Sequence, residues 1–353
     1  MPAPWLAERD QSALQKALLL PLGLASGGYS LAARLHRAVY SGGWTTPRRL
    51  PCSVVSVGSL LAGGSGKTPV TAWVAGRLRA RGHRVVIATR GYGRTGGDAV
   101  HTLSDGRRVR GDVSGVGDEA LVLVAHAADV PVLVGRDRGV VGLRAISSFA
   151  ADVLVLDDGF QHHRLSRDVD IVTLDGGFGF GNRRILPRGP LREPVSALAR
   201  AHAVGILDGP LSEADAALLE QHAVHPRVFQ ARRRAARLCR IGAPAREGEP
   251  ATALAGARVG MLAALGQPSA FRRTLEEKGA TVIAERSFRD HHRYRARDLR
   301  NLRREADMWV TTEKDAVKIL PRWARGIDLR VLTIDLAVAS EDSFLDWLEA
   351  QLR

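Results

Sequence analysis

The sequence predicts an α/β protein built on a parallel β-sheet with helices on both faces. Short β-branched segments such as Ser53–Val57 and Arg84–Thr89 alternate with helical segments along most of the chain. A glycine-rich loop separates Ser53–Val57 from the helix that follows, which is the strand–loop–helix order of a phosphate-binding loop. The 353 residues are enough for two domains, each with its own core.

The loop after Ser53–Val57 carries the most specific motif of the chain. Its residues are Gly63, Gly64, Ser65, Gly66, Lys67 and Thr68. Glycines let backbone N–H groups surround phosphate oxygens, a lysine at this place reaches the β- and γ-phosphates, and the threonine hydroxyl is a ligand for Mg²⁺. Leu61 stands where the common form of the motif has its first glycine. The segment therefore predicts binding of a nucleoside triphosphate, despite that departure.

Two aspartates follow the apolar segment Val153–Leu156. Asp157 and Asp158 then lie at the carboxyl end of a buried strand, where a carboxylate holds Mg²⁺ or its water shell in nucleotide-binding sheets. The pattern is weak by itself, but it gains weight from the phosphate-binding loop upstream. We therefore predict Thr68, Asp157 and Asp158 as the metal site.

Two further loops carry candidate substrate residues. Arg90 and Tyr92 follow the strand Arg84–Thr89, at an edge where parallel sheets bind ligands. A long loop rich in Gly, Pro and Arg lies between the predicted strands 169–174 and 203–207, and it is longer than a simple connection requires. Its arginines suit an anionic substrate, although a solvated surface loop is the alternative. The candidates there are Arg183, Arg188 and Arg192.

The charge of the chain favours acidic partners. Lys and Arg number 51 against 37 Asp and Glu, a net charge of +14, which suits phosphates, anionic lipid or nucleic acid. Aromatic residues make up only 5% of the chain and do not alternate with the basic ones, so stacking platforms for single strands are not expected. Cys52 and Cys239 have neither a disulfide framework nor metal-ligand spacing, which is typical of a reduced, cytosolic protein.

The chain divides into three predicted parts. Residues 1–45 contain the apolar segment Ala17–Leu24, which is too short and too interrupted to span a bilayer and is followed by arginines. We predict a membrane-interfacial helix there, with a helix packed on its own domain as the alternative. Residues 46–225 form the domain with the phosphate-binding loop. Residues 226–353 form a second α/β domain, connected by extended segments near 227–241 and 329–336.

A series of motifs along the chain resembles the tetraacyldisaccharide 4′-kinase family of the lipid A pathway in Gram-negative bacteria. The motifs are SVGSLLAGGSGKTP, RGYGR, GDEALVL, VLVGRDR, LDDGFQHHRLSRDVDIV, GFGNRRILPRGPLREP, FRDHHRY and TTEKDAVK. They run from about Leu14 to Lys318 in the family's order and spacing. Each motif alone is modest, but the set is specific. That family also lacks the first glycine of the loop, so Leu61 fits the resemblance.

The resemblance implies a reaction: ATP-dependent phosphorylation, with Mg²⁺, of the 4′-hydroxyl of a tetraacylated glucosamine disaccharide 1-phosphate. It also implies two α/β domains that face each other across a cleft and are joined by a two-stranded hinge. The lipid disaccharide and the cytoplasmic face of the inner membrane are the implied partners, with a peripheral location there and no nucleic acid.

The resemblance also implies roles for single residues. The aspartate of the family's Gly-Asp-Glu motif is Asp118 here, implied as the general base, although an N-cap is the commonest reason for an aspartate before a helix. The histidine of Phe-x-Asp-His is His291, implied as its partner from the second domain. Lys67 completes the implied catalytic set.

Two other functions remain alternatives. One is a membrane-associated switch ATPase with a related loop, but such loops commonly carry a second lysine where Leu61 and Ala62 stand here. The other is a nucleic-acid-stimulated ATPase, suggested by the positive charge and opposed by the low aromatic content.

Overall fold

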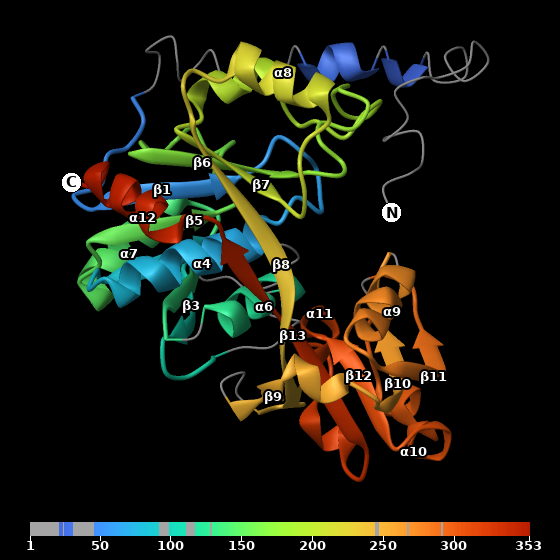
Figure 1. Cartoon of the computed structure of the whole chain (residues 1–353). Helices are drawn as coiled ribbons and strands as arrows, with labels where there is room; N and C mark the ends of the chain where they lie inside the picture. The colour runs from blue at the N-terminus through green and yellow to red at the C-terminus, as the bar shows by residue number, and fades with distance from the viewer. Residues whose placement is uncertain are drawn as a thin grey trace.

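The computed structural model describes residues 21–23, 25–30, 46–91, 99–110, 117–127, 129–243, 247–266, 268–290 and 292–353. Within these residues thirteen strands form one sheet, in the order β11-β10-β12-β13-β8-β7-β6-β1-β5-β2-β4-β3, with β9 paired to β8 at the side. Figure 1 shows two bodies of unequal size joined by the long strands β8 and β13. The larger body holds β1 to β7, and the smaller one holds β10 to β12.

The strands are β1 (Ser53–Gly58), β2 (Val85–Thr89), β3 (His101–Asp105), β4 (Pro131–Val134), β5 (Val153–Asp157), β6 (Val169–Asp175), β7 (Ala203–Leu207), β8 (Arg227–Arg240), β9 (Glu249–Pro250), β10 (Arg258–Ala263), β11 (Thr281–Ser287), β12 (Met308–Thr312) and β13 (Asp328–Val338). The α-helices are α4 (Lys67–Ala80), α6 (Asp118–His126), α7 (Arg138–Phe149), α8 (Glu213–His222), α9 (Pro268–Glu277), α10 (Leu302–Glu305), α11 (Glu313–Ala316) and α12 (Glu341–Ala350). The 3₁₀ turns are η1 (Val195–Arg200), η3 (Ala251–Leu254), η4 (Ala296–Leu299) and η5 (Pro321–Ala324).

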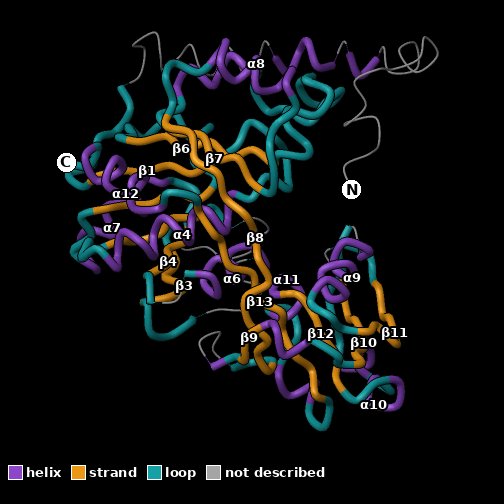
Figure 2. The backbone as a smooth tube through the Cα atoms, viewed as in Figure 1, coloured by secondary structure: helices purple, strands orange, loops and turns teal. Residues whose placement is uncertain are grey.

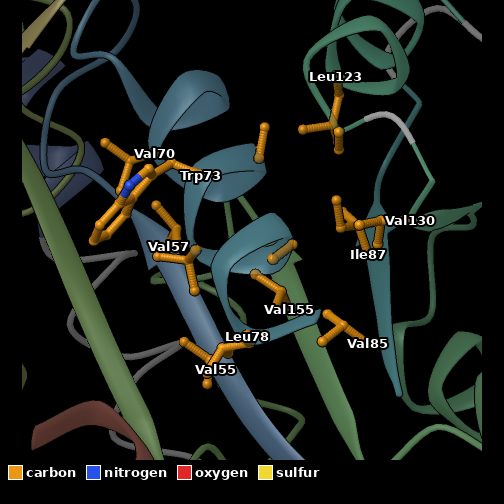
Figure 3. Close-up of a cluster of buried hydrophobic side chains, with 14 of the residues drawn as sticks. Val55, Val57, Val70, Trp73, Leu78, Val85, Ile87, Leu123, Val130 and Val155 are labelled. Atoms are coloured by element: carbon orange, nitrogen blue, oxygen red, sulfur yellow. The ribbon is translucent and has the colours of Figure 1, made fainter. Parts of the chain in front are cut away.

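The larger body is a parallel sheet covered on both faces, as predicted. Strand β1 pairs in parallel with β5 and β6, and all six of its residues are buried. Val55 and Val57 lie in the core cluster beneath α4, whereas Val54 lies in the cluster beneath α7. The continuous β-branched run therefore reflects burial on both faces. Figure 3 shows the α4 side, where Val57 lies beside Val70 and Trp73, and Val55 lies beside Leu78.

One strand of the larger body is absent from the sequence prediction. Strand β3 lies at the sheet edge and pairs antiparallel with β4. Its sequence, HTLSD, contains only one residue of the large apolar type, because an edge strand needs no second buried face. The weak hydrophobic pattern explains the omission.

The smaller body repeats the layered arrangement. Strands β11, β10 and β12 are parallel, and β13 continues that sheet in parallel beside β12. Met261 and Val310 pack with Phe271 of α9 on one face. Leu262 and Trp309 belong to the cluster on the other face. The sequence prediction of a second, smaller α/β unit is confirmed.

Strands β8 and β13 form the predicted two-stranded hinge. They pair antiparallel from Arg330 opposite Arg240 to Val338 opposite Ala231. Strand β8 also pairs with β7 of the larger body, and β13 with β12 of the smaller one. The register shifts between Leu332 and Ile334, where the ribbon leaves the smaller sheet. Figure 2 shows the two strands running together between the bodies.

The last helix returns to the larger body, although its residues lie in the range predicted for the second domain. Phe344 of α12 packs against Phe229 of β8 and Trp73 of α4, with ring-centroid distances of 4.4 and 5.7 Å. Arg81, just after α4, pairs with three acidic side chains of α12. The chain thus leaves the larger body through β8 and comes back through β13. The domain boundaries given above remain a proposal. By its contacts with α4, helix α12 belongs to the larger body.

Residues 21–23 and 25–30 are helical and contact the long loop between β6 and η1. Ser26 Oγ donates to the Ile185 carbonyl at 2.9 Å and accepts from the Arg188 amide at 3.1 Å. Most of the predicted interfacial segment Ala17–Leu24 lies outside the described residues. In the described ranges, no helix combines the length and apolar character needed to cross a bilayer.

Candidate nucleotide and phosphoryl-transfer site

The predicted phosphate-binding loop lies between β1 and α4, with its glycines in left-handed conformations. The φ angles are 98° at Gly63, 40° at Gly64 and 74° at Gly66. A Cβ at Gly66 would lie 2.3 Å from Leu207 Cδ2, so only glycine fits there. At Gly63 and Gly64, by contrast, nothing described lies within 4 Å of an added Cβ. This open concave backbone at a helix N-terminus fits a phosphate group.

Leu61, which departs from the common motif, has a structural role. It is 3% exposed and forms an isolated antiparallel bridge with Leu191. The neighbouring Ala62 amide donates to the Pro190 carbonyl at 2.8 Å. The start of the loop is therefore held by the segment before η1, and an apolar side chain is buried where other loops have glycine.

Asp157, the last residue of β5, is buried beneath the loop. Its Oδ1 accepts from Thr71 Oγ1 at 3.2 Å and its Oδ2 from Thr89 Oγ1 at 3.1 Å. Burial raises the pKa of the Asp157 carboxyl to about 6, and the charge of Asp158 raises it further while Lys67 opposes the rise. The two threonines were missed by the sequence analysis, since hydroxyls on separate elements leave no local pattern.

Asp158 is the more open of the two predicted carboxylates, and it brings the loop lysine and one predicted arginine together. Its backbone is left-handed, with φ 52°. Arg192 Nη1 donates to Asp158 Oδ2 at 2.7 Å, and Lys67 Nζ lies 3.8 Å from Oδ1. Among the described atoms, Oδ1 is buried and has no hydrogen-bond partner. An orphaned carboxylate oxygen beside the loop lysine fits a divalent cation held jointly with phosphates.

In the parts of the chain that the structure describes, no three His, Cys, Asp or Glu side chains form a metal cluster. Thr68, in the first turn of α4, comes from the loop side, and Asp157 and Asp158 come from the end of β5.

Arg138 is a site residue that the sequence analysis did not single out. It opens α7, is 3% exposed, and donates to the carbonyls of Gly135 at 2.6 Å and Asp157 at 3.4 Å. Burial lowers the pKa of its guanidinium to about 10. A buried arginine behind the carboxylates fixes the backbone that presents Asp157 and Asp158. The available signal was an arginine at the start of the helix that follows a buried strand.

Of the other predicted residues, some lie near this cluster, since the charge of Arg90 acts on Arg138 and that of Glu119, next to Asp118, acts on Asp157, and others lie apart or are not described. Arg183 donates to the buried Asp215 of α8 at 2.9 Å, and Arg90 is exposed after β2. Arg188 carries the amide that binds Ser26. Tyr92 and His291 lie outside the described residues. Asp118 is the first residue of α6, and Gly117 is the N-cap, so the N-cap alternative is wrong.

A cavity of about 460 Å³ lies between the segment after β7 and the strands β8 and β13. Gly209 and Pro210 line it from the segment after β7, and Arg232 and Arg234 line it from β8. Leu207, whose side chain lies against Gly66, ends β7 two residues before Gly209 of the cavity lining.

Comparison with known proteins shows which family the chain is similar to. The family model for tetraacyldisaccharide-1-P 4′-kinase matches residues 15–353. The tetraacyldisaccharide 4′-kinase of Anaeromyxobacter sp. (strain Fw109-5) is 40% identical over 351 residues, which is 96% of this chain and 93% of that protein. The enzyme of that name from Anaeromyxobacter dehalogenans (strain 2CP-C) is 43% identical over 329 residues, covering 89% and 85%.

A solved structure extends the likeness to the whole fold. The apo form of LpxK from Aquifex aeolicus in complex with ATP superimposes with a TM-score of 0.79 at 27% identity, over 96% of this chain and 99% of that one. The family match and the relatives together are decisive: the chain belongs to the tetraacyldisaccharide-1-P 4′-kinase family.

Proposed function

We propose that this protein transfers the γ-phosphate of ATP to the 4′-hydroxyl of a tetraacylated glucosamine disaccharide 1-phosphate, a step of lipid A synthesis. The family assignment supports the reaction. The observation that carries the proposal is the convergence of Lys67, Asp158 and Arg192 beside a left-handed glycine loop, because this is the machinery for holding and neutralising a triphosphate.

Phosphoryl transfer needs positioning and charge neutralisation more than covalent help. Bound ATP supplies the phosphoryl group, and Mg²⁺ offsets the charge of its phosphates. The amides of Gly63–Thr68 bind phosphate oxygens, and Lys67 adds a compact positive charge. We assign Thr68 and Asp158 to the cation, with Asp157 behind them as the residue that fixes their geometry through its two threonine bonds. The base and ribose are assigned to the cavity lined by Gly209, Pro210 and β8.

We assign the activation of the sugar hydroxyl to Asp118 and His291. Asp118 opens α6 of the larger body, and His291 follows Asp290 in the smaller body. Lys314 pairs with Asp290 at 2.9 Å, which holds the chain next to His291. Because the base is divided between the two bodies, phosphoryl transfer depends on how the bodies are positioned relative to each other. Their approach also limits hydrolysis of ATP by water.

Attachment to the membrane is a further part of the proposal. A lipid disaccharide is water-insoluble, so its kinase has to reach it at a membrane surface. The net charge of +14 and the helical residues 21–23 and 25–30 support peripheral attachment to the cytoplasmic face of the inner membrane.

ATP turnover with three additions tests the function. We expect turnover with tetraacyl disaccharide 1-phosphate, and not with empty vesicles or single-stranded DNA. Lys67→Ala should abolish transfer with an unchanged melting temperature, while Lys278→Ala, after α9 in the smaller body, should behave as the wild type. Turnover stimulated equally by empty vesicles indicates the switch ATPase, and stimulation by DNA indicates the nucleic-acid ATPase.

A further inference from the structure

A buried ion pair joins the two bodies beside the hinge. His126, the last residue of α6, places Nε2 at 3.1 Å from Oε2 of Glu313, the first residue of α11. The two side chains are only 13% and 10% exposed. Figure 1 shows α6 and α11 side by side at β13, and the two helices are in contact. One side of the pair therefore belongs to the larger body and the other to the smaller.

The same carboxylate also binds the hinge. Glu313 Oε2 accepts from the backbone amide of Ile334 at 3.0 Å. Ile334 is the first residue past the register shift of β13, and Thr333, at the shift, accepts from the Arg237 amide at 3.1 Å. A β-bulge is a place where a ribbon bends. One oxygen atom thus connects α6, α11 and the bend of the hinge.

The surroundings favour a charged pair. Burial acts to lower the pKa of His126, but the hydrogen bond and charge of Glu313, with Asp335 of β13, raise it, and the pKa lies above its usual value. The C-terminus of α6 adds negative potential at His126. From β8, Cys239 faces the same carboxylate, and Arg237 lies near Cys239. A buried carboxylate that loses its cation is strongly destabilised, so the pair resists separation.

We propose that His126 and Glu313 are positioning residues: their pair latches α6 to the smaller body at the hinge, and so sets the orientation in which phosphoryl transfer takes place. This inference rests on the proposed function, since it concerns the place of α6 in the reaction. Asp118 lies at the opposite end of the same helix of nine residues. Because α6 is a rigid helix, holding its last residue against α11 also fixes the orientation of its first turn relative to the smaller body.

The latch has a defined effect on kinetics. His126→Leu removes the cation, and Glu313→Gln keeps an acceptor for Ile334 but removes the charge. Because misplacement by about 1 Å costs roughly 100-fold in rate, each variant should lose roughly 10- to 100-fold in kcat, with the KM for ATP unchanged. The double variant should be little worse than either single one, because both remove one contact. A merely structural pair would lower the melting temperature without this separation of kcat from KM.

The pH dependence follows from the raised pKa of His126. The stabilising contribution of its charge is present below the usual pKa of about 6.5 and is lost as pH rises through the higher pKa of the folded protein. Imidazole NMR signals, assigned by their absence in His126→Leu, should titrate above about 6.5 in the wild type and lower in Glu313→Gln.

The distance between the bodies gives a second measurement. Spin labels at Ser148→Cys on α7 and Arg273→Cys on α9 lie on exposed positions of the two bodies, while the native cysteines are buried. We expect one narrow distance distribution in the wild type and a broad one in His126→Leu. Arg286→Gln, which breaks an exposed pair with Glu305 inside the smaller body, is the matched control and should change neither distance nor kcat.

The outcomes distinguish failure of the latch from failure of the proposed function. Wild-type kcat together with an unchanged distance distribution in His126→Leu overturns the latch. A folded double variant whose rate loss is the product of the single losses also overturns it. Broadening of the distance in the variant, with no transfer by the wild type to the lipid disaccharide, supports the latch and refutes the proposed function instead.

Discussion

Phe344→Ala tests whether the returning helix α12 is part of the larger body. Phe344 is 2% exposed and lies between Phe229 of β8 and Trp73 of α4. Truncating a buried phenylalanine costs about 3–5 kcal/mol. Its ring neighbours Phe229 and Trp73 lie on a strand and on another helix, so the cavity cannot collapse easily. We therefore place the loss in the upper half of that range.

The melting temperature converts this free energy into an observable. For a cooperative unit of roughly 150–250 residues, each kcal/mol shifts the midpoint by about 2–4 °C, so a fall of roughly 8–20 °C is expected. Circular dichroism would follow the melting, and hydrogen exchange would report loss of protection in residues 341–350 and in α4.

Asp346→Ala is the matched control on the same helix. Asp346 is 71% exposed and pairs with Arg81 at 2.6 Å, and such surface pairs contribute about 1 kcal/mol or less. If Phe344→Ala melts within about 3 °C of the wild type, or no lower than Asp346→Ala, the assignment of α12 to the core of the larger body is wrong.

The remaining predictions concern the site and the N-terminus. Gly66→Ala should lower turnover roughly 100-fold, because the backbone there has a φ of 74° and the new Cβ would meet Leu207 Cδ2 at 2.3 Å, and turnover at the wild-type rate would contradict this. Asp118→Asn and His291→Ala should each cost about 10²–10⁴-fold in kcat with little further loss in combination, so that activity retained by Asp118→Asn excludes the base. Deletion through Ser26 should release the protein from anionic vesicles, and salt should weaken binding of the full chain; a full chain that does not sediment with such vesicles at low salt contradicts the attachment.

The sequence predicted those features of the fold whose physical cause is local. The run Ser53–Gly58 needs burial on both faces, and its β-branched residues indicate this directly. Gly63 and Gly66 have positive φ angles, which only glycine adopts without strain, so the loop was visible as a motif. The extended basic segment near 227–241 predicted β8. A hinge strand is not covered along its whole length, so it lacks a continuous apolar face and can carry basic residues.

The features that escaped prediction depend on residues brought together by topology. Thr71 and Thr89 bind Asp157 from a helix and a strand far apart in sequence. The same holds for His126 and Glu313, which meet only because the hinge folds the smaller body against α6. The amphipathic pattern of α12 showed that it needed an apolar partner but could not identify α4 as that partner.

The hydrogen-bonded ribbon of β8 and β13 has a mechanical consequence. A paired ribbon is stiff within its own plane, since shear there would break the ladder between Arg330–Val338 and Ala231–Arg240. It is compliant in twist and in bending out of that plane, and the bulge at Leu332–Ile334 concentrates the bending at one point. The two bodies therefore move relative to each other by bending and twisting of the ribbon, and not by displacement within its plane. We expect the ribbon to bend elastically out of its plane, so that the orientation of this plane sets the path along which the smaller body moves.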